Sequence, residues 1–184
     1  YVSDPYQPLP QYEESMGSWF ISPDGEPTLK ILGEKVSQLM QEIEVDNVIF
    51  YGSSMGGYAA ILLSCLVSGA KAIAECPQLY LMKHPGSRFV CENILSDKVS
   101  VDEIEPLNFL QSGNPEHVRI VCSIFDRHYS QHVLPFMEEI QNLDVKHQSI
   151  ISLNAYSNPG YKKGHVALQK KDALRIINDT ANSD

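Results

Sequence analysis

The stretch NVIFYGSSMGGYAAI, residues 47–61, constrains the fold more than any other part of the sequence. Its continuously apolar run VIFYG is typical of a strand that is buried on both faces, as in a parallel sheet. A run rich in glycine and alanine follows and indicates a helix that packs closely on that strand. The stretch therefore predicts a buried sheet with a helix crossing tightly over it.

The rest of the chain repeats this alternation of strand and helix. The patterns predict strands at 71–75, 118–125 and 147–153, and helices at about 28–44, 56–67, 133–143 and 166–178. Ser100 and Glu103 form a capping box that predicts another helix start. Residues 1–27 are irregular and rich in proline, glycine and aromatics, after the end of a strand at Tyr1–Ser3. The prediction is one α/β domain over residues 1–184, with a mostly parallel sheet and helices on both faces.

The amino-acid composition indicates what kind of protein this is and which kinds of partner it disfavours. A chain of 184 residues that is 43% hydrophobic can bury a core without a disulfide or metal staple. The net charge of −9 argues against nucleic acid or an anionic membrane as the main partner. The four cysteines lack disulfide or metal-ligand spacing, which favours a reduced, cytoplasmic setting. We expect no membrane span, no metal and no bound cofactor, and the sequence makes no prediction of oligomeric state.

The turn Gly52-Ser53-Ser54-Met55-Gly56 matches the pattern G-x-S-x-G at a strand-to-helix junction. Such a turn presents the central serine above the sheet, and the next N–H points at a developing oxyanion. By this register Ser54 is the candidate nucleophile, Met55 is an oxyanion donor, and Ser53 is a small spacer. The alternative is a glycine-rich turn that binds phosphate on helix N–H groups, but no lysine stands at the phosphate-loop position.

VIFYGSSMGGYAA resembles the nucleophile elbow of the α/β-hydrolase superfamily, and the resemblance extends from about residue 28 to the C-terminus. It implies a three-layer fold and the order serine, acid, histidine, each after a successive strand. His165, in GYKKGHVAL, has the place of the superfamily's general base. Asp126, after the strand 118–125, is the expected acid, and His128 lies close by. Glu75 is the competing acid, because some hydrolases place this residue one strand earlier.

The other histidines have no such placement. We expect them to be ordinary surface residues: His84, His117, His132 and His147.

The chain departs from the superfamily pattern before the elbow. It has no HGG-type motif, and 53 residues precede Ser54, so the early strands are reduced or lie outside this chain. The resemblance implies a second oxyanion donor near Asp4–Tyr6, for which we name Pro5 and Tyr6. We expect Trp19 to line the substrate pocket or to be a core or lid aromatic. Residues 77–116 occupy the place of superfamily lids and caps.

A fainter resemblance links these features, together with ECPQ at residues 75–78, to bacterial hydrolase-fold proteins of surface-glycan biosynthesis, including carbohydrate O-acetyltransferases. It implies Gln78 as a second substrate contact. The predicted function is acyl transfer through an acyl-enzyme on Ser54, as an esterase or an O-acetyltransferase of an ester or carbohydrate substrate. Acetyl-CoA would be the acyl donor of a transferase. The alternative is a catalytically inactive hydrolase-fold binding module in a glycan-biosynthesis or secretion assembly.

Overall fold

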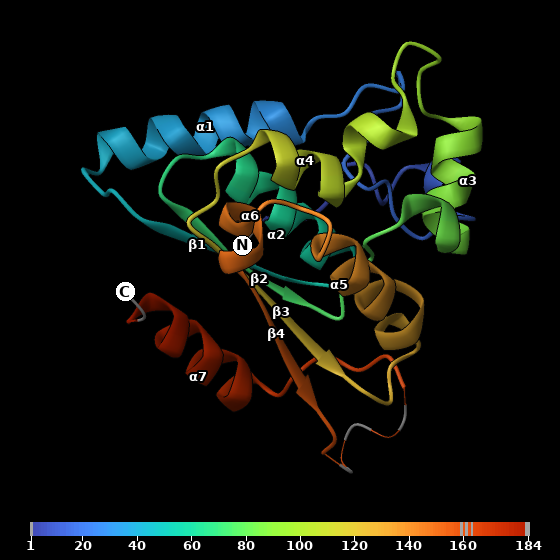
Figure 1. Cartoon of the computed structure of the whole chain (residues 1–184). Coiled ribbons are helices and arrows are strands. Elements are labelled where there is room, and N and C mark those ends of the chain that lie inside the picture. Colours follow the sequence, from blue (N-terminus) through green and yellow to red (C-terminus); the bar gives the residue numbers. More distant parts are fainter. Residues whose placement is uncertain (1, 159, 161, 163, 183–184) are drawn as a thin grey trace.

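Four parallel strands form the centre of the molecule, which we describe from a computed structural model covering residues 2–158, 160, 162 and 164–182 (Figure 1). Their order in the sheet follows their order in the chain: β1 (Val48–Ser53), β2 (Ala70–Glu75), β3 (His117–Ser123) and β4 (Ile151–Tyr156). Because all four strands run the same way, their carboxyl ends meet along one edge of the sheet. The predicted parallel α/β architecture is confirmed.

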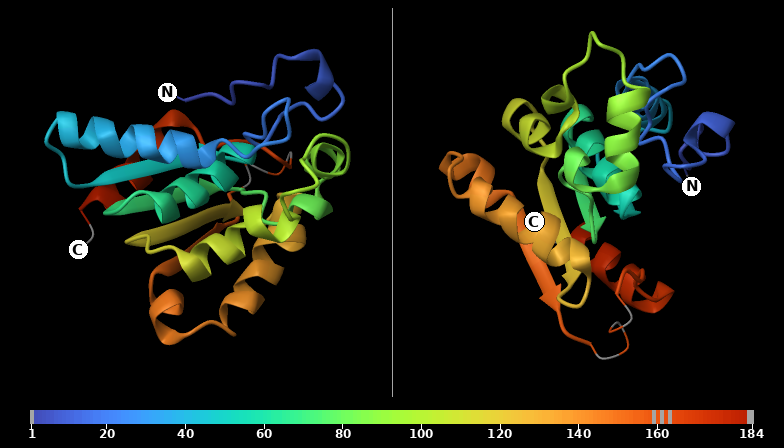
Figure 2. Two further views of the ribbon diagram at one scale, coloured as in Figure 1. Left: turned by 90° about the horizontal axis from the view of Figure 1, so that it is seen from above. Right: turned by 90° about the vertical axis from the view of Figure 1, so that its right-hand side faces the viewer.

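Helices cover both faces of this sheet (Figure 2). One face carries a core of small and branched strand residues under three helices, α2 (Met55–Leu66), α4 (Pro106–Ser112) and α5 (Leu134–Ile140). On the other face lies α7 (Lys170–Ala181), where Arg119 of β3 donates a hydrogen bond to Thr180 at 3.0 Å. Helix α1 (Leu29–Glu42) lies beside α2.

A second core joins the N-terminal segment to the outer surface of α2. Tyr12, Trp19 and Phe20 pack there with Leu62 of α2 and Val90 of α3 (Pro85–Asn93). Three short helical turns complete this region: Pro10–Tyr12, Leu81–Lys83 and Val101–Ile104. Residues 77–116 thus contain α4, which belongs to the sheet's own core, as well as α3. The role of 77–116 as a lid or cap stays a prediction.

Four local predictions need correction. The strand predicted at 147–153 lies at 151–156, because Asp144 accepts a hydrogen bond from the His147 amide at 2.9 Å and starts a short helix, α6 (Val145–Ser149). Residues 2 and 3 form no strand, and Tyr1 lies outside the described residues. Ser100 makes no side-chain cap to Val101–Ile104. The last helix begins at 170 rather than 166, after a segment that Glu75 holds.

Strand β1 forms one end of the strand order. Its outer side lines a pocket of about 850 Å³, together with residues of the N-terminal segment and α1. In the part of the chain that the structure describes, no helix is long and apolar enough to cross a membrane.

Candidate active site

Ser54 lies at the turn between β1 and α2 in a conformation that few L-residues adopt. Its φ is 57° and its ψ is −117°, a strained combination that persists only where the surrounding structure enforces it. Its backbone is fixed on both sides, because its N–H donates to the Glu75 carbonyl at 2.9 Å and its carbonyl accepts from the Tyr58 amide at 3.1 Å. The turn therefore holds Ser54 where the sequence pattern predicts.

Gly52 makes this turn possible. A Cβ at Gly52 would stand 2.1 Å from the carbonyl oxygen of Gly56, so no side chain fits at the first glycine. A Cβ at Gly56 would meet nothing within 4 Å. The two glycines of the pattern therefore differ: only the first is required for the strand and helix to pass each other.

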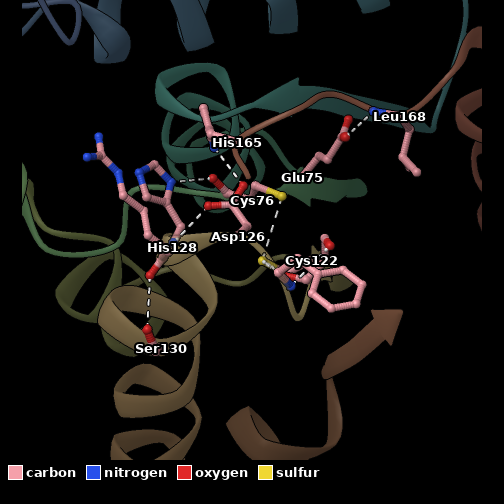
Figure 3. Close-up of polar contacts among 11 residues, drawn as sticks. Glu75, Cys76, Cys122, Asp126, His128, Ser130, His165 and Leu168 are labelled. Atoms are coloured by element: carbon pink, nitrogen blue, oxygen red, sulfur yellow. Dashed lines mark hydrogen bonds and ion pairs between the residues drawn. The ribbon is translucent and has the colours of Figure 1, made fainter. Parts of the chain in front are cut away.

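Asp126 and His165 form a hydrogen-bonded pair at the carboxyl edge of the sheet (Figure 3). His165 Nδ1 lies 2.7 Å from Asp126 Oδ2, and the amide of His128 donates to Asp126 Oδ1 at 2.8 Å. The Asp126 side chain is fully buried, whereas that of His165 is 37% exposed. Burial alone would raise the pKa of Asp126, but the hydrogen bonds from His165 and the His128 amide outweigh it and lower that pKa to about 2. Asp126 is therefore a carboxylate that orients the imidazole.

Glu75, the competing acid, makes different contacts. It is buried at the end of β2, accepts a hydrogen bond from the Tyr51 hydroxyl at 2.5 Å, and accepts another from the Leu168 amide. Burial raises the pKa of Glu75. Glu75 therefore anchors the segment that follows His165, while Asp126 holds the imidazole itself (Figure 3).

Ser54 and His165 are not joined directly. Among the described residues, no hydrogen bond links the Ser54 hydroxyl to His165, and the pocket that contains Ser54 is not lined by His165. The structure thus joins two of the three predicted residues by a hydrogen bond and places the third after β1, at the same carboxyl edge of the sheet.

The predicted oxyanion donors divide into two groups. Met55 begins α2 beside Ser54 and lines the pocket. Pro5 has no backbone N–H, and the Tyr6 amide already donates to Asp4 Oδ1 at 3.1 Å. We therefore correct the assignment of Pro5 and Tyr6: one cannot donate, and the other is engaged within its own turn.

Trp19 and Gln78 meet across the pocket wall. The indole Nε1–H of Trp19 donates to Gln78 Oε1 at 2.7 Å, and both side chains are buried and line the pocket. Trp19 has a φ of 50°, another strained backbone position. Fifty-nine residues separate the two in sequence.

The pocket has a volume of about 850 Å³. Its apolar wall comes from α1, β1 and α2, and its polar wall includes residues at the carboxyl ends of β2 and β3. Its lining includes Ser54, Met55, Trp19, Gln78, His84 and Arg127.

A cluster of histidines lies beside this pocket, and the sequence patterns did not predict it. The ring of His128 lies 4.4 Å from that of His165, 4.9 Å from that of His132 and 5.8 Å from that of His84, centre to centre. His132 is 1% exposed, so its assignment to the surface was wrong. Its Nδ1 accepts hydrogen bonds from the Leu79 and Tyr80 amides, both at 3.2 Å. The sequence signal was DRHYSQH, which places histidines two and six residues after the expected acid.

One group of possible metal ligands occurs in the described part of the chain. Atoms of Cys76, Asp126 and His165 lie within 4.8 Å of one another. Asp126 Oδ2 and His165 Nδ1 already share a hydrogen bond of 2.7 Å, which is the geometry of an acid–imidazole pair.

No protein-family profile and no curated protein sequence matches the chain. Several solved structures are similar to it. The capsule O-acetyltransferase of Neisseria meningitidis serogroup A matches with a TM-score of 0.65 and 16% identity, over 91% of this chain and 69% of that one. Esterase B from Lactobacillus rhamnosis matches with a TM-score of 0.65 and 14% identity, over 85% of this chain and 60% of that one.

A third similar structure is the fluorophosphonate-binding serine hydrolase F of Staphylococcus aureus, with a TM-score of 0.60 and 18% identity over 86% of this chain and 65% of that one. At such identities the likeness establishes the fold alone. The chain has an α/β-hydrolase-like fold and spans 60% to 69% of the length of these three proteins.

Proposed function

We propose that the protein catalyses acyl transfer through an acyl-enzyme on Ser54. His165 acts as the base that takes the serine proton and then as the acid that gives it to the leaving group, and Asp126 holds its imidazole and stabilises the imidazolium. The observation that carries this proposal is the Asp126–His165 pair at 2.7 Å, on the same sheet edge as the strained Ser54 turn.

One acyl group and one proton are transferred in each half of the catalytic cycle. Ser54 Oγ forms a bond to the acyl carbon as its proton moves to His165 Nε2, and the Met55 amide stabilises the oxyanion. The alcohol or thiol of the donor leaves with that proton. Water or a second alcohol then attacks the acyl-enzyme and gives its proton to His165, which passes that proton to Ser54 Oγ as the bond between Ser54 and the acyl group breaks. Ser54 and His165 would have to come within hydrogen-bond distance in this cycle, as is common when catalytic groups engage substrate.

Two acceptors are compatible with this scheme. Water makes the protein an esterase, and a sugar hydroxyl makes it an O-acetyltransferase that draws acetyl from acetyl-CoA. The structural likeness to both an O-acetyltransferase and an esterase supports both acceptors as candidates. Incubation with acetyl-CoA and a panel of glycans decides between them: acetylated glycan supports the transferase, and free acetate alone supports the esterase.

Hydrolysis of 4-nitrophenyl acetate by matched serine variants tests the chemistry. Ser54→Ala should lose all activity above the uncatalysed rate, whereas Ser53→Ala, one residue away on the same turn, should retain most of it. Equal activity of Ser54→Ala and wild type would contradict the proposal.

The non-catalytic alternative rests on one observation, the missing hydrogen bond between Ser54 and His165. If the protein is a binding module, the wild type and Ser54→Ala should bind a glycan with equal affinity, and neither should turn over an ester. The acid–imidazole pair, which a binding surface does not need, favours the enzyme.

A further inference from the structure

The polar wall of the Ser54 pocket offers hydrogen-bond donors. Gln78, His84 and Arg127 line this wall. The reasoning rests on the proposed function, because it concerns the substrate that would reach Ser54.

The amide orientation of Gln78 is fixed by its neighbour. An indole N–H can only donate, so the atom that faces Trp19 Nε1 at 2.7 Å must be the Gln78 oxygen. The amide nitrogen therefore points away from Trp19. Within the described residues this nitrogen has no hydrogen-bond partner, and Gln78 lines the pocket. Gln78 thus presents two N–H groups.

The tautomer of His84 is fixed in the same way. The Ser87 amide points at His84 Nδ1 at 3.5 Å, so Nδ1 carries the lone pair and the proton is on Nε2. Burial, reinforced by His128 and Arg127, lowers the pKa of His84 to about 4, so the ring is neutral at pH 7. Its Nε2–H has no partner among the residues that the structure describes.

Arg127 adds a full positive charge. It follows Asp126 directly, and over the described ranges no carboxylate forms an ion pair with its guanidinium. The acid that also lines the pocket, Asp4, is already engaged: it accepts hydrogen bonds from the Ser18 amide, the Ser18 hydroxyl and the Tyr6 amide. The other acid nearby, Asp126, is paired with His165.

Gln78, His84 and Arg127 together offer N–H donors, one of them cationic, and this arrangement favours a group that accepts hydrogen bonds. From this juxtaposition we propose that Gln78, His84 and Arg127 bind an oxyanion, a carboxylate or a phosphate, on the substrate that is presented to Ser54. Charge-assisted hydrogen bonds from a guanidinium to such groups are the strongest of their kind. The substrate class is therefore an anionic ester or an anionic hydroxylated acceptor, in spite of the net charge of −9 on the whole chain.

Two acetate esters that differ in charge test this proposal. The wild-type kcat/KM for the acetate ester of 4-hydroxybenzoate should exceed that for the ester of 4-hydroxybenzamide by about tenfold, the effect of one charge-assisted hydrogen bond. This ratio should fall toward one in Arg127→Gln and recover in part in Arg127→Lys. Arg88→Gln is the matched control, because Arg88 is exposed on α3 and does not line the pocket, so its ratio should equal that of wild type.

A third ester distinguishes the two oxyanions. The acetate ester of 4-hydroxyphenyl phosphate replaces the carboxylate with a phosphate, and the larger kcat/KM identifies the natural group. A wild-type ratio near one for both anions, with measurable turnover, would overturn the proposal. So would an unchanged ratio in Arg127→Gln.

Binding without turnover keeps the proposal separate from the catalytic one. In Ser54→Ala, the ester of 4-hydroxybenzoate should shift the imidazole NMR signals of His84, which His84→Gln identifies by their loss. The double variant Ser54→Ala/Arg127→Gln should need about tenfold more ester for the same shift. If this shift appears but no ester is turned over, the proposed function fails and the oxyanion site stands. If esters are turned over without a charge preference and without this shift, the oxyanion site fails and the proposed function stands.

Discussion

At the residue scale, the site depends on a few side chains whose charge is set by their neighbours. Asp126 and Glu75 are both buried carboxyls near His165, yet their pKa values shift in opposite directions. Hydrogen bonds from His165 and the His128 amide favour the ionised form of Asp126, whereas burial favours the neutral form of Glu75. Environment therefore assigns one carboxyl to orient the imidazole and the other to anchor the chain.

Asp126→Asn should leave the fold intact and reduce kcat for ester hydrolysis by roughly 10³- to 10⁴-fold, because the amide favours the wrong imidazole tautomer. Steady-state kinetics with 4-nitrophenyl acetate measure this. Glu75→Gln, which changes the other carboxyl in the same way, is the matched comparison and should cost far less. A larger loss from Glu75→Gln than from Asp126→Asn would reverse the assignment.

The same shift predicts a pH dependence of stability. The pKa of Asp126 falls from 3.8 to about 2 on folding, so its contribution is fully present above pH 3.8 and is lost as the pH falls through 2. That contribution is about 2 kcal/mol. The difference in unfolding free energy between wild type and Asp126→Asn should shrink over this window in urea titrations. A difference that stays constant from pH 5 to pH 2 would show that Asp126 is not stabilised as a carboxylate.

Residue patterns predicted part of the site and missed another part. Ser54, Asp126 and His165 could be proposed because each follows a strand, and strand order fixes which edge they share. His84 and Arg127 could not, since their meeting depends on how residues 77–116 fold over the sheet. Pro5 and Tyr6 were misassigned because a turn motif does not reveal that Asp4 captures the Tyr6 amide.

At the scale of elements, the crossing of β1 and α2 decides whether Ser54 is presented at all. Strand and helix approach so closely that a Cβ at Gly52 would stand 2.1 Å from Gly56 backbone. The G-x-S-x-G pattern treats its two glycines alike, but only one is sterically required. A local cap can also override a strand pattern. The sequence predicted a strand from residue 147, but the Asp144 side chain caps a short helix there, α6.

Gly52→Ala should lower the free energy of unfolding by about 3 kcal/mol or more, because backbone must move to admit the methyl group. Gly56→Ala, whose methyl group would meet nothing within 4 Å, should change it by less than about 1 kcal/mol. Urea unfolding followed by circular dichroism compares the two. Equal effects would mean that the close crossing is absent.

At the scale of the whole molecule, the N-terminal segment and the sheet are tied together at the pocket. Trp19, the one tryptophan of the chain, is 3% exposed and bonds to Gln78, which follows β2. The strained backbone at Trp19, Ser54 and Cys76 is gathered around this junction. The α/β class and parallel sheet followed from periodicity, but this tie did not, because no local pattern relates positions 19 and 78.

Tryptophan fluorescence therefore reports on the N-terminal segment alone. In wild type, the fluorescence and far-ultraviolet circular dichroism transitions in urea should coincide, as expected for one cooperative unit. Gln78→Leu removes the acceptor of the buried indole N–H, at a cost of about 1–3 kcal/mol. The fluorescence transition should then precede the dichroism transition. Coincident transitions in Gln78→Leu would show that the hydrogen bond does not hold this segment.

The central claim is that Ser54 becomes covalently acylated, and intact-mass measurement after exposure to a fluorophosphonate tests it most directly. The wild-type protein should gain the mass of one probe group, and peptide mapping should place that group on Ser54. Ser53→Ala should label like wild type, and Ser54→Ala should not label. A folded wild-type protein that gains no mass, or one that carries the label at another residue, would contradict the account.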